Sequence, residues 1–151
     1  MVNIIEYIKS VSLFQSLKED EMELLATRFV LIDEKQGDTV IKESEKANAL
    51  YILIKGEANV VMETDQIEFV IDELQPGQFF GEMALLDNKP RSADVVCKTD
   101  CKLLRLESSD FYNLLEQHPS ILKGLVVELC SRLRKANAKL KGENNPRLYI
   151  D

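Results

Sequence analysis

Residues 76–93 have the sequence PGQFFGEMALLDNKPRSA, and this stretch, called the cassette below, guides the interpretation of the whole chain. Gly81 and Glu82 precede a short apolar run, and a lone arginine, Arg91, follows. Glycine lets a backbone approach an anion closely, and arginine offers a planar set of N–H donors to it. A carboxylate repels phosphate, so Glu82 suits a sugar hydroxyl that needs an acceptor. The pattern predicts a site for a sugar-phosphate.

The segment resembles the phosphate-binding cassette of cyclic nucleotide-binding domains. That family includes the regulatory subunits of cyclic AMP-dependent kinase, the cyclic nucleotide-gated channels and the bacterial catabolite activator. Its pattern is Phe-Gly-Glu, two or three small or apolar residues, a short turn, and Arg-(Ser/Thr/Ala)-Ala, all of which occur between Phe80 and Ala93. The order of expected elements is similar to the family over about residues 12–141. Ser44 departs from it, since the family usually turns with glycine there.

The resemblance implies roles for Arg91 and Glu82 of the cassette. Arg91 precedes an apolar run, so we expect it to face inward, where a guanidinium costs several kcal/mol unless it is paired. A cyclic phosphate would pair with it, and a surface arginine capping a loop is the alternative. Glu82 would accept the ribose 2′-hydroxyl, or merely favour the start of a helical turn. The residues expected at this phosphate–ribose end are Gly81, Glu82, Met83, Ala84, Arg91, Ser92 and Ala93.

The base is less determined by the sequence. The resemblance implies that Val60 and Ile71 line it from strands, and that the long C-terminal helix covers it near Leu133, Ala136 or Asn137. Ser92 is compatible with either base, and Asp94 is expected to face away from the phosphate because strand residues alternate. Cyclic AMP is favoured over cyclic GMP, because no residue is dedicated to guanine.

The strand pattern predicts the fold. Short runs of Val, Ile, Leu and Tyr alternate with turn signals across residues 29–107, which is typical of a sandwich or barrel. We expect a mainly β fold, an antiparallel β-roll or jelly roll (double-stranded β-helix), with N-terminal helices and a long C-terminal helix. The predicted strands are 29–34, 38–42, 49–55, 58–63, 67–74, 93–98 and 101–107.

Helices are expected on both sides of the roll. Residues 2–28 show helical spacing, with Ser16 and Glu19 as a capping box before the second half. Residues 108–141 form the C-terminal helices, with Pro119 in the first turn of the longer one and Gly142 and Pro146 ending it. A seam of Leu122, Val126, Leu129, Leu133, Ala136 and Leu140 is typical of a short coiled coil. Two alternatives stay open for it: a homodimer through residues 119–141, or packing on the chain's own roll.

Composition excludes several classes of protein. The length of 151 residues predicts one domain, residues 1–151. The formal net charge is −7, which argues against a nucleic-acid partner. We interpret the basic cluster of the last helix as a solvated face. Only nine residues follow Gly142, so no DNA-binding domain is expected. There is no apolar run long enough to span a membrane and no basic N-terminal region, which indicates a cytoplasmic protein. The basic cluster comprises Arg132, Arg134, Lys135, Lys139 and Lys141.

Catalysis, metal binding and a cofactor are not expected. The three cysteines, Cys97, Cys101 and Cys130, form no redox or zinc motif, and the single histidine, His118, is too few for a metal cupin. No nucleophile is paired with a base.

The sequence therefore predicts a stand-alone regulatory module that binds a cyclic nucleotide and moves its C-terminal helix against a protein partner. A degenerate scaffold domain and a transcription regulator without its DNA-binding part are the alternatives.

Overall fold

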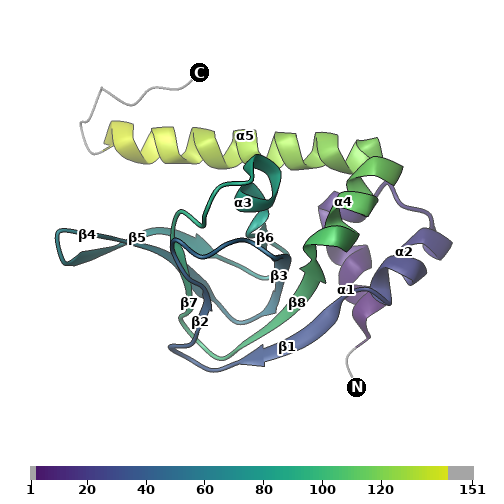
Figure 1. Cartoon of the computed structure of the whole chain (residues 1–151), viewed down its shortest axis with the longest axis horizontal. Helices are drawn as coiled ribbons and strands as arrows, with labels where there is room; N and C mark the ends of the chain where they lie inside the picture. The colour runs from purple at the N-terminus through teal and green to yellow at the C-terminus, as the bar shows by residue number, and fades with distance from the viewer. Residues whose placement is uncertain (1–2, 143–151) are drawn as a thin grey trace.

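The computed structural model describes residues 3–142, which form two four-stranded antiparallel sheets flanked by helices (Figure 1). The strand orders are β1-β8-β3-β6 and β2-β7-β4-β5. This confirms the predicted antiparallel roll. The strands are β1 (Val30–Glu34), β2 (Thr39–Ile41), β3 (Ala49–Lys55), β4 (Ala58–Thr64), β5 (Ile67–Leu74), β6 (Phe79–Phe80), β7 (Asp94–Cys97) and β8 (Cys101–Glu107).

The two faces of β3 explain why its sequence is apolar from Ala49 to Ile54. Its odd-numbered residues Ala49, Tyr51 and Leu53 pack between the sheets, and its even-numbered residues pack under the helices. A strand buried on both faces reads as a continuous apolar run. The roll thus has an inner core between the sheets and an outer core against the helices.

The N-terminal segment is helical in three short pieces, not as one continuous stretch. They are α1 (Ile4–Ser10), the 3-10 turn η1 (Ser12–Phe14) and α2 (Glu19–Ala26). The predicted Ser16–Glu19 capping box is wrong, because α2 begins only at Glu19. The Ser16 hydroxyl instead lies 2.9 Å from that of Ser120.

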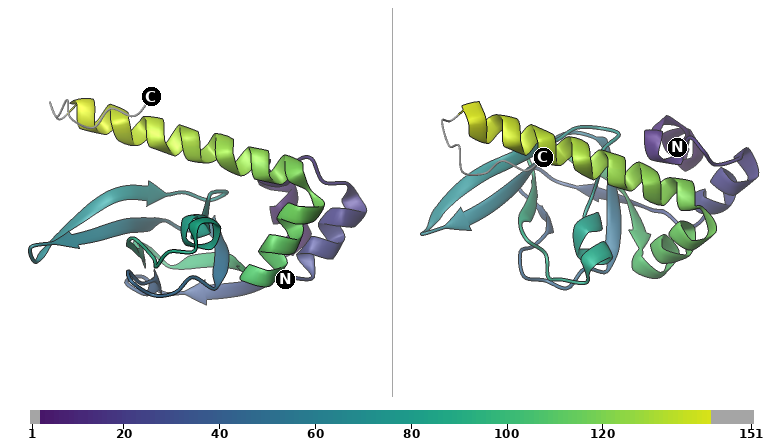
Figure 2. Two further views of the ribbon diagram at one scale, coloured as in Figure 1. Left: turned by 45° about the horizontal axis from the view of Figure 1, so that its top comes forward. Right: turned by 90° about the horizontal axis from the view of Figure 1, so that it is seen from above.

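The C-terminal helices are α4 (Ser108–Gln117) and α5 (Pro119–Gly142), and Pro119 opens α5 as predicted. Figure 2 shows α5 crossing the roll and extending above the hairpin of β4 and β5. Its buried residues are Ile121 and Leu125, whereas Leu122, Val126 and Leu133 of the predicted seam are 42–52% exposed. At least 42% of the surface of each of these three side chains is thus left uncovered by the chain itself. Pro146 lies outside the described residues.

The cassette contributes two elements that position the site. β6 is a two-residue strand paired with β3, and α3 (Glu82–Asp87) follows it directly. The strand pattern did not predict β6, since two residues carry no alternation. The remaining strand predictions agree with the structure to within one residue at each end.

Candidate functional site

Gly81 joins β6 to α3 in a conformation that favours glycine, with φ at +88°. A Cβ atom here would lie 2.9 Å from Nη1 of Arg91 and 3.1 Å from Cδ1 of Ile41. The missing side chain therefore gives the arginine its space. Both neighbours of Gly81 on the chain are buried: Phe80 belongs to the inner core, and Glu82 is the first residue of α3.

Arg91 lies under this turn with only 8% of its surface exposed. Its Nη1 donates to the Gly81 carbonyl, and its Nη2 donates to the Ala49 carbonyl at 2.9 Å. No ion pair within residues 3–142 includes Arg91. Burial lowers the pKa of Arg91, and Tyr51 and Glu82 offset part of this effect. The structure therefore holds a buried cation with carbonyl oxygens as its hydrogen-bond acceptors.

The backbone around Arg91 is fixed by the loop that contains Ser44. The N–H of Arg91 donates to the Glu45 carbonyl, and the Arg91 carbonyl accepts from the N–H of Ser44, both at 2.9 Å. Ser44 has φ at +71°, a left-handed conformation that glycine would adopt without strain. The loop keeps the conformation of a glycine turn although it carries serine. Asp94 accepts from the N–H of Glu43 at 2.6 Å, so its carboxylate serves this loop.

Glu82 is 2% exposed, and its Oε1 accepts from Nη1 of Arg132 at 3.0 Å. Burial raises the pKa of Glu82, and the Arg132 guanidinium lowers it by less. The attraction between the Arg132 guanidinium and the Glu82 carboxylate therefore does not fully offset the effect of burial on the carboxylate.

Arg132 corrects one sequence-based interpretation, because it is not part of a solvated face. It reaches from α5 to the cassette, where it also donates to the Phe79 carbonyl and lies 4.6 Å above the Phe79 ring. Its Nε is 3.4 Å from Glu128, one turn earlier on α5. The spacing from Ile121 and Leu125 to Glu128 and Arg132 follows one helix face, which is the signal that could have revealed it.

The other residues predicted at the phosphate–ribose end differ in their exposure. Ala84 is buried against the roll, Ala93 is half-buried, and Met83 and Ser92 are exposed. A further contact not expected from the sequence links α3 to α4, since the Tyr112 hydroxyl donates to the Leu85 carbonyl at 2.6 Å.

The residues predicted around the base lie on elements that face each other. These residues are more exposed than Glu82 and Arg91. Val60 and Asn137 are half-buried, whereas Ile71 and Leu133 are 43% and 42% exposed. The Lys139 ammonium lies 3.5 Å from the Ile71 carbonyl, which brings the far part of α5 to β5.

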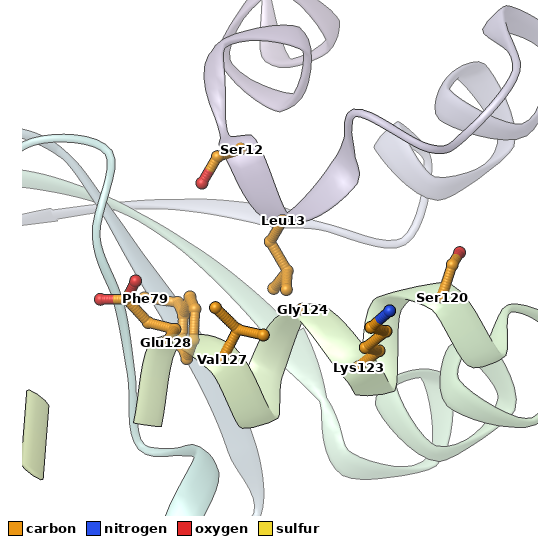
Figure 3. Close-up of a pocket in the computed structure, with 8 residues that line it drawn as sticks. All are labelled: Ser12, Leu13, Phe79, Ser120, Lys123, Gly124, Val127 and Glu128. Atoms are coloured by element: carbon orange, nitrogen blue, oxygen red, sulfur yellow. The ribbon is translucent and has the colours of Figure 1, made fainter. Parts of the chain in front are cut away.

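A separate groove of about 360 Å³ lies between η1 and the first half of α5 (Figure 3). It borders the cassette only at Phe79, and none of the predicted ligand-binding residues lines it. The remaining lining residues are Ser12, Leu13, Ser120, Lys123, Gly124, Val127 and Glu128.

No group of three or more His, Cys, Asp or Glu side chains in residues 3–142 is arranged to hold a metal ion. In the same part of the chain, every helix is too short or too polar to span a bilayer.

Comparison with known proteins finds similar chains among kinase regulatory subunits and bacterial receptor proteins. The chain is 38% identical over 117 residues to a cAMP-dependent protein kinase regulatory subunit of Aspergillus fumigatus, covering 78% of this chain and 28% of the relative. It is 31% identical over 134 residues to the cyclic AMP receptor protein of Thermus thermophilus, covering 88% of this chain and 62% of the relative. The chain thus spans less than two thirds of these relatives' lengths.

Solved structures of similar fold include proteins of the same kind. The catabolite activator protein of Thermus thermophilus superimposes with a TM-score of 0.75 at 31% identity, over 87% of this chain and 62% of that one. A cyclic nucleotide-binding domain from Methylobacillus flagellatus shares the fold with a TM-score of 0.79 at 22% identity, over 98% of this chain and 84% of that one. The family profile described as "Cyclic nucleotide-binding domain" matches residues 33–118, more than half of the chain. The chain belongs to the cyclic nucleotide-binding domain family.

Proposed function

We propose that this domain binds a cyclic nucleotide, cyclic AMP in preference to cyclic GMP, and acts as a regulatory module without catalysis of its own. The observation that carries the proposal is Arg91, a buried cation hydrogen-bonded to carbonyl oxygens and without an ion-pair partner in residues 3–142. A singly charged cyclic phosphate would supply the missing anion through charge-assisted hydrogen bonds. The kinase regulatory subunit and the receptor protein matched above, whose names include cyclic AMP, support this ligand class.

Glu82 would bind the ribose in the same site. Its Oε1 accepts from Arg132, and its second carboxylate oxygen is suited to accept from the 2′-hydroxyl. A buried acceptor left without its donor costs about 1–3 kcal/mol, so deoxyribose analogues would bind more weakly. Met83, Ala84, Ser92 and Ala93 would complete the phosphate end, and Val60, Ile71, Leu133 and Asn137 would surround the base.

Coupling to the C-terminal helix would pass through Arg132. This side chain hydrogen-bonds two cassette groups, the Glu82 carboxylate and the Phe79 carbonyl. A ligand that engages Glu82 alters the partner of Arg132, and thereby the position that α5 prefers. A protein partner that contacts α5 would receive the signal.

A calorimetric titration of cyclic AMP and cyclic GMP tests the binding proposal, with wild-type protein and Arg91→Ala in parallel. We expect heat of binding with the wild type for at least one nucleotide, and a loss of at least about 100-fold in affinity in Arg91→Ala, as for other lost charge-assisted contacts. Arg134→Ala, an exposed arginine of α5, is the matched control. No heat and no thermal stabilisation of the wild type at millimolar nucleotide would leave the scaffold alternative.

A homodimer through α5 is the second part of the proposal. The side chains of Leu122, Val126 and Leu133 are exposed at the spacing of a coiled-coil seam, and a second copy would cover them. Sedimentation equilibrium of the wild type and Val126→Glu tests it. A monomeric wild type at high micromolar concentration would contradict the dimer.

Binding to duplex DNA that weakens steeply with added salt would instead support the alternative of a transcription regulator.

A further inference from the structure

The helix α3 lies between two residues with a left-handed backbone. Gly81 precedes it with φ at +88°, and Asn88 follows it with φ at +58°. The helix itself has six residues, Glu82–Asp87, and an isolated helix of this length is marginal in water. Contacts from other elements therefore have to hold α3 in its place on the roll.

The two ends of α3 are held by different helices. At its first residue, Nη1 of Arg132 in α5 donates to the Glu82 carboxylate at 3.0 Å. In its last turn, the Tyr112 hydroxyl of α4 donates to the Leu85 carbonyl at 2.6 Å, a good distance for an O–H···O bond. The last four carbonyls of a helix have no partner within it, so Tyr112 supplies a donor that α3 itself lacks.

The bond from Tyr112 adds direction to contacts that are otherwise apolar. Leu85 is 3% exposed and packs in the outer core, together with the fully buried Phe111 that precedes Tyr112. The rings of Phe111 and Tyr112 lie 6.0 Å apart, and Tyr112 is 42% exposed. Apolar packing is non-directional, so it keeps α3 on the roll without fixing its rotation. A hydrogen bond depends on angle as well as distance, and the bond to Leu85 restricts that rotation.

The rotation of α3 decides where the Glu82 carboxylate points. Leu85 lies three residues after Glu82, about 4.5 Å along the helix axis. A helix held at Leu85 cannot turn freely about the glycine that precedes it. Arg132 bonds one carboxylate oxygen, Oε1, and the direction of the second oxygen follows the backbone that carries it.

We propose that Tyr112 is a positioning residue for Glu82. By holding the last turn of α3, its hydroxyl sets the direction of the carboxylate oxygen that is not bonded to Arg132, and this makes the site selective for ribose over deoxyribose. The inference rests on the proposed function for the role of Glu82 toward the 2′-hydroxyl. Tyr112 acts through α3, not by contact with the nucleotide.

The first test needs no nucleotide. The ¹³C signal of the Leu85 carbonyl reports whether this oxygen accepts a hydrogen bond, and we expect it to shift in Tyr112→Phe, which keeps the ring and removes only the hydroxyl. Amide exchange across α3 should accelerate about three- to tenfold. Tyr7→Phe, the same change in α1, is the control and leaves both measurements as in the wild type. Unchanged exchange in α3 of Tyr112→Phe overturns the proposal, whether or not the carbonyl signal moves.

The second test compares cyclic AMP with 2′-deoxy cyclic AMP by calorimetric titration. We expect Tyr112→Phe to lower the affinity for cyclic AMP about three- to tenfold and to leave the affinity for the deoxy analogue as in the wild type. The preference for ribose should therefore fall by the same factor. A merely structural role would weaken the binding of both nucleotides equally, and that result would contradict positioning.

Glu82→Gln provides the matched background. If Tyr112 acts through Glu82, adding Tyr112→Phe to Glu82→Gln should cost no further affinity for cyclic AMP, whereas an additive loss would overturn the proposal. A wild type that binds neither nucleotide defeats the proposed function and the ribose selectivity with it. Amide exchange in α3 then still decides whether Tyr112 holds that helix.

Discussion

The cassette buries two charged side chains, Glu82 and Arg91, whereas the hairpin of β4 and β5 exposes apolar ones. Glu82 and Arg91 are 2% and 8% exposed, but Phe69 and Val70 are 49% and 55% exposed. Burying charge is expensive unless partners are provided, and the cassette provides them from α5, β3 and its own backbone. Within residues 3–142, β5 pairs only with β4, so its other edge is open.

The difference shows that the two ends of the candidate site are determined to different degrees. At the proposed phosphate–ribose end, Glu82 and Arg91 are buried and hydrogen-bonded, so substitutions there should cost stability as well as binding. At the proposed base end, Ile71 and Leu133 are 43% and 42% exposed, so substitutions should cost little stability. The following predictions test this contrast in order of expected size.

Gly81→Ala should have the largest effect. A left-handed φ costs a non-glycine residue about 1–2 kcal/mol, and the new Cβ would lie 2.9 Å from Nη1 of Arg91. Adding the weakened arginine hydrogen bonds, we expect a loss of about 2–4 kcal/mol in the free energy of unfolding and no measurable nucleotide binding. Urea denaturation and calorimetry measure the two effects.

Gly142→Ala is the matched control, because a Cβ there meets no atom within 4 Å. If Gly81→Ala binds nucleotide as the wild type does, the tight turn is not required for the site.

Arg132→Gln should come second. It removes the cation next to a carboxylate that is 2% exposed, but Arg132 is itself 22% exposed, so water offsets part of the loss. We expect the free energy of unfolding to fall by about 1–2 kcal/mol, and amide exchange in α5 to accelerate in the absence of ligand.

The exposed Arg134→Gln should change neither quantity. Unchanged exchange in α5 of Arg132→Gln would mean that this contact does not hold the helix on the cassette.

The contrast between Gly81 and Arg132 also shows what could be predicted from the sequence. Gly81, Glu82 and Arg91 lie within one local motif, and turn chemistry and strand alternation are local signals, so the cassette and the strands were predicted. The Arg132–Glu82 pair joins residues 50 positions apart, and no local pattern encodes that distance. Tyr112 was missed for the same reason, since its partner Leu85 belongs to another element.

The third prediction concerns pH. Burial raises the pKa of Glu82 in the folded protein, so the folded state holds a proton there more tightly than the unfolded chain. Its stabilising contribution is therefore fully present below the unfolded pKa of about 4.3 and is lost as pH rises through the folded pKa. We expect the stability of the wild type relative to Glu82→Gln to fall as pH rises from about 4.

Denaturation by urea at a series of pH values measures this difference. Glu63→Gln, at an exposed acid of the hairpin, is the comparison and should show no such trend. A relative stability of wild type that rises with pH would show that Arg132 dominates over burial at Glu82.

Gln66→Gly is the smallest change and tests the open end. Asp65 and Gln66 connect β4 to β5 with φ at +54° and +65°, the pattern of a type I′ turn that prefers glycine at its second position. Removing the left-handed strain, less the extra entropy of glycine in the unfolded chain, should stabilise the protein by about 0.5 kcal/mol. Gln75→Gly, at a turn residue without positive φ, should instead destabilise the protein.

Nucleotide affinity of Gln66→Gly should stay as in the wild type, because the turn between β4 and β5 lies at the tip of the hairpin, away from the cassette. A changed affinity in Gln66→Gly would mean that the hairpin closes on the ligand and that the base end is less independent than its exposure indicates.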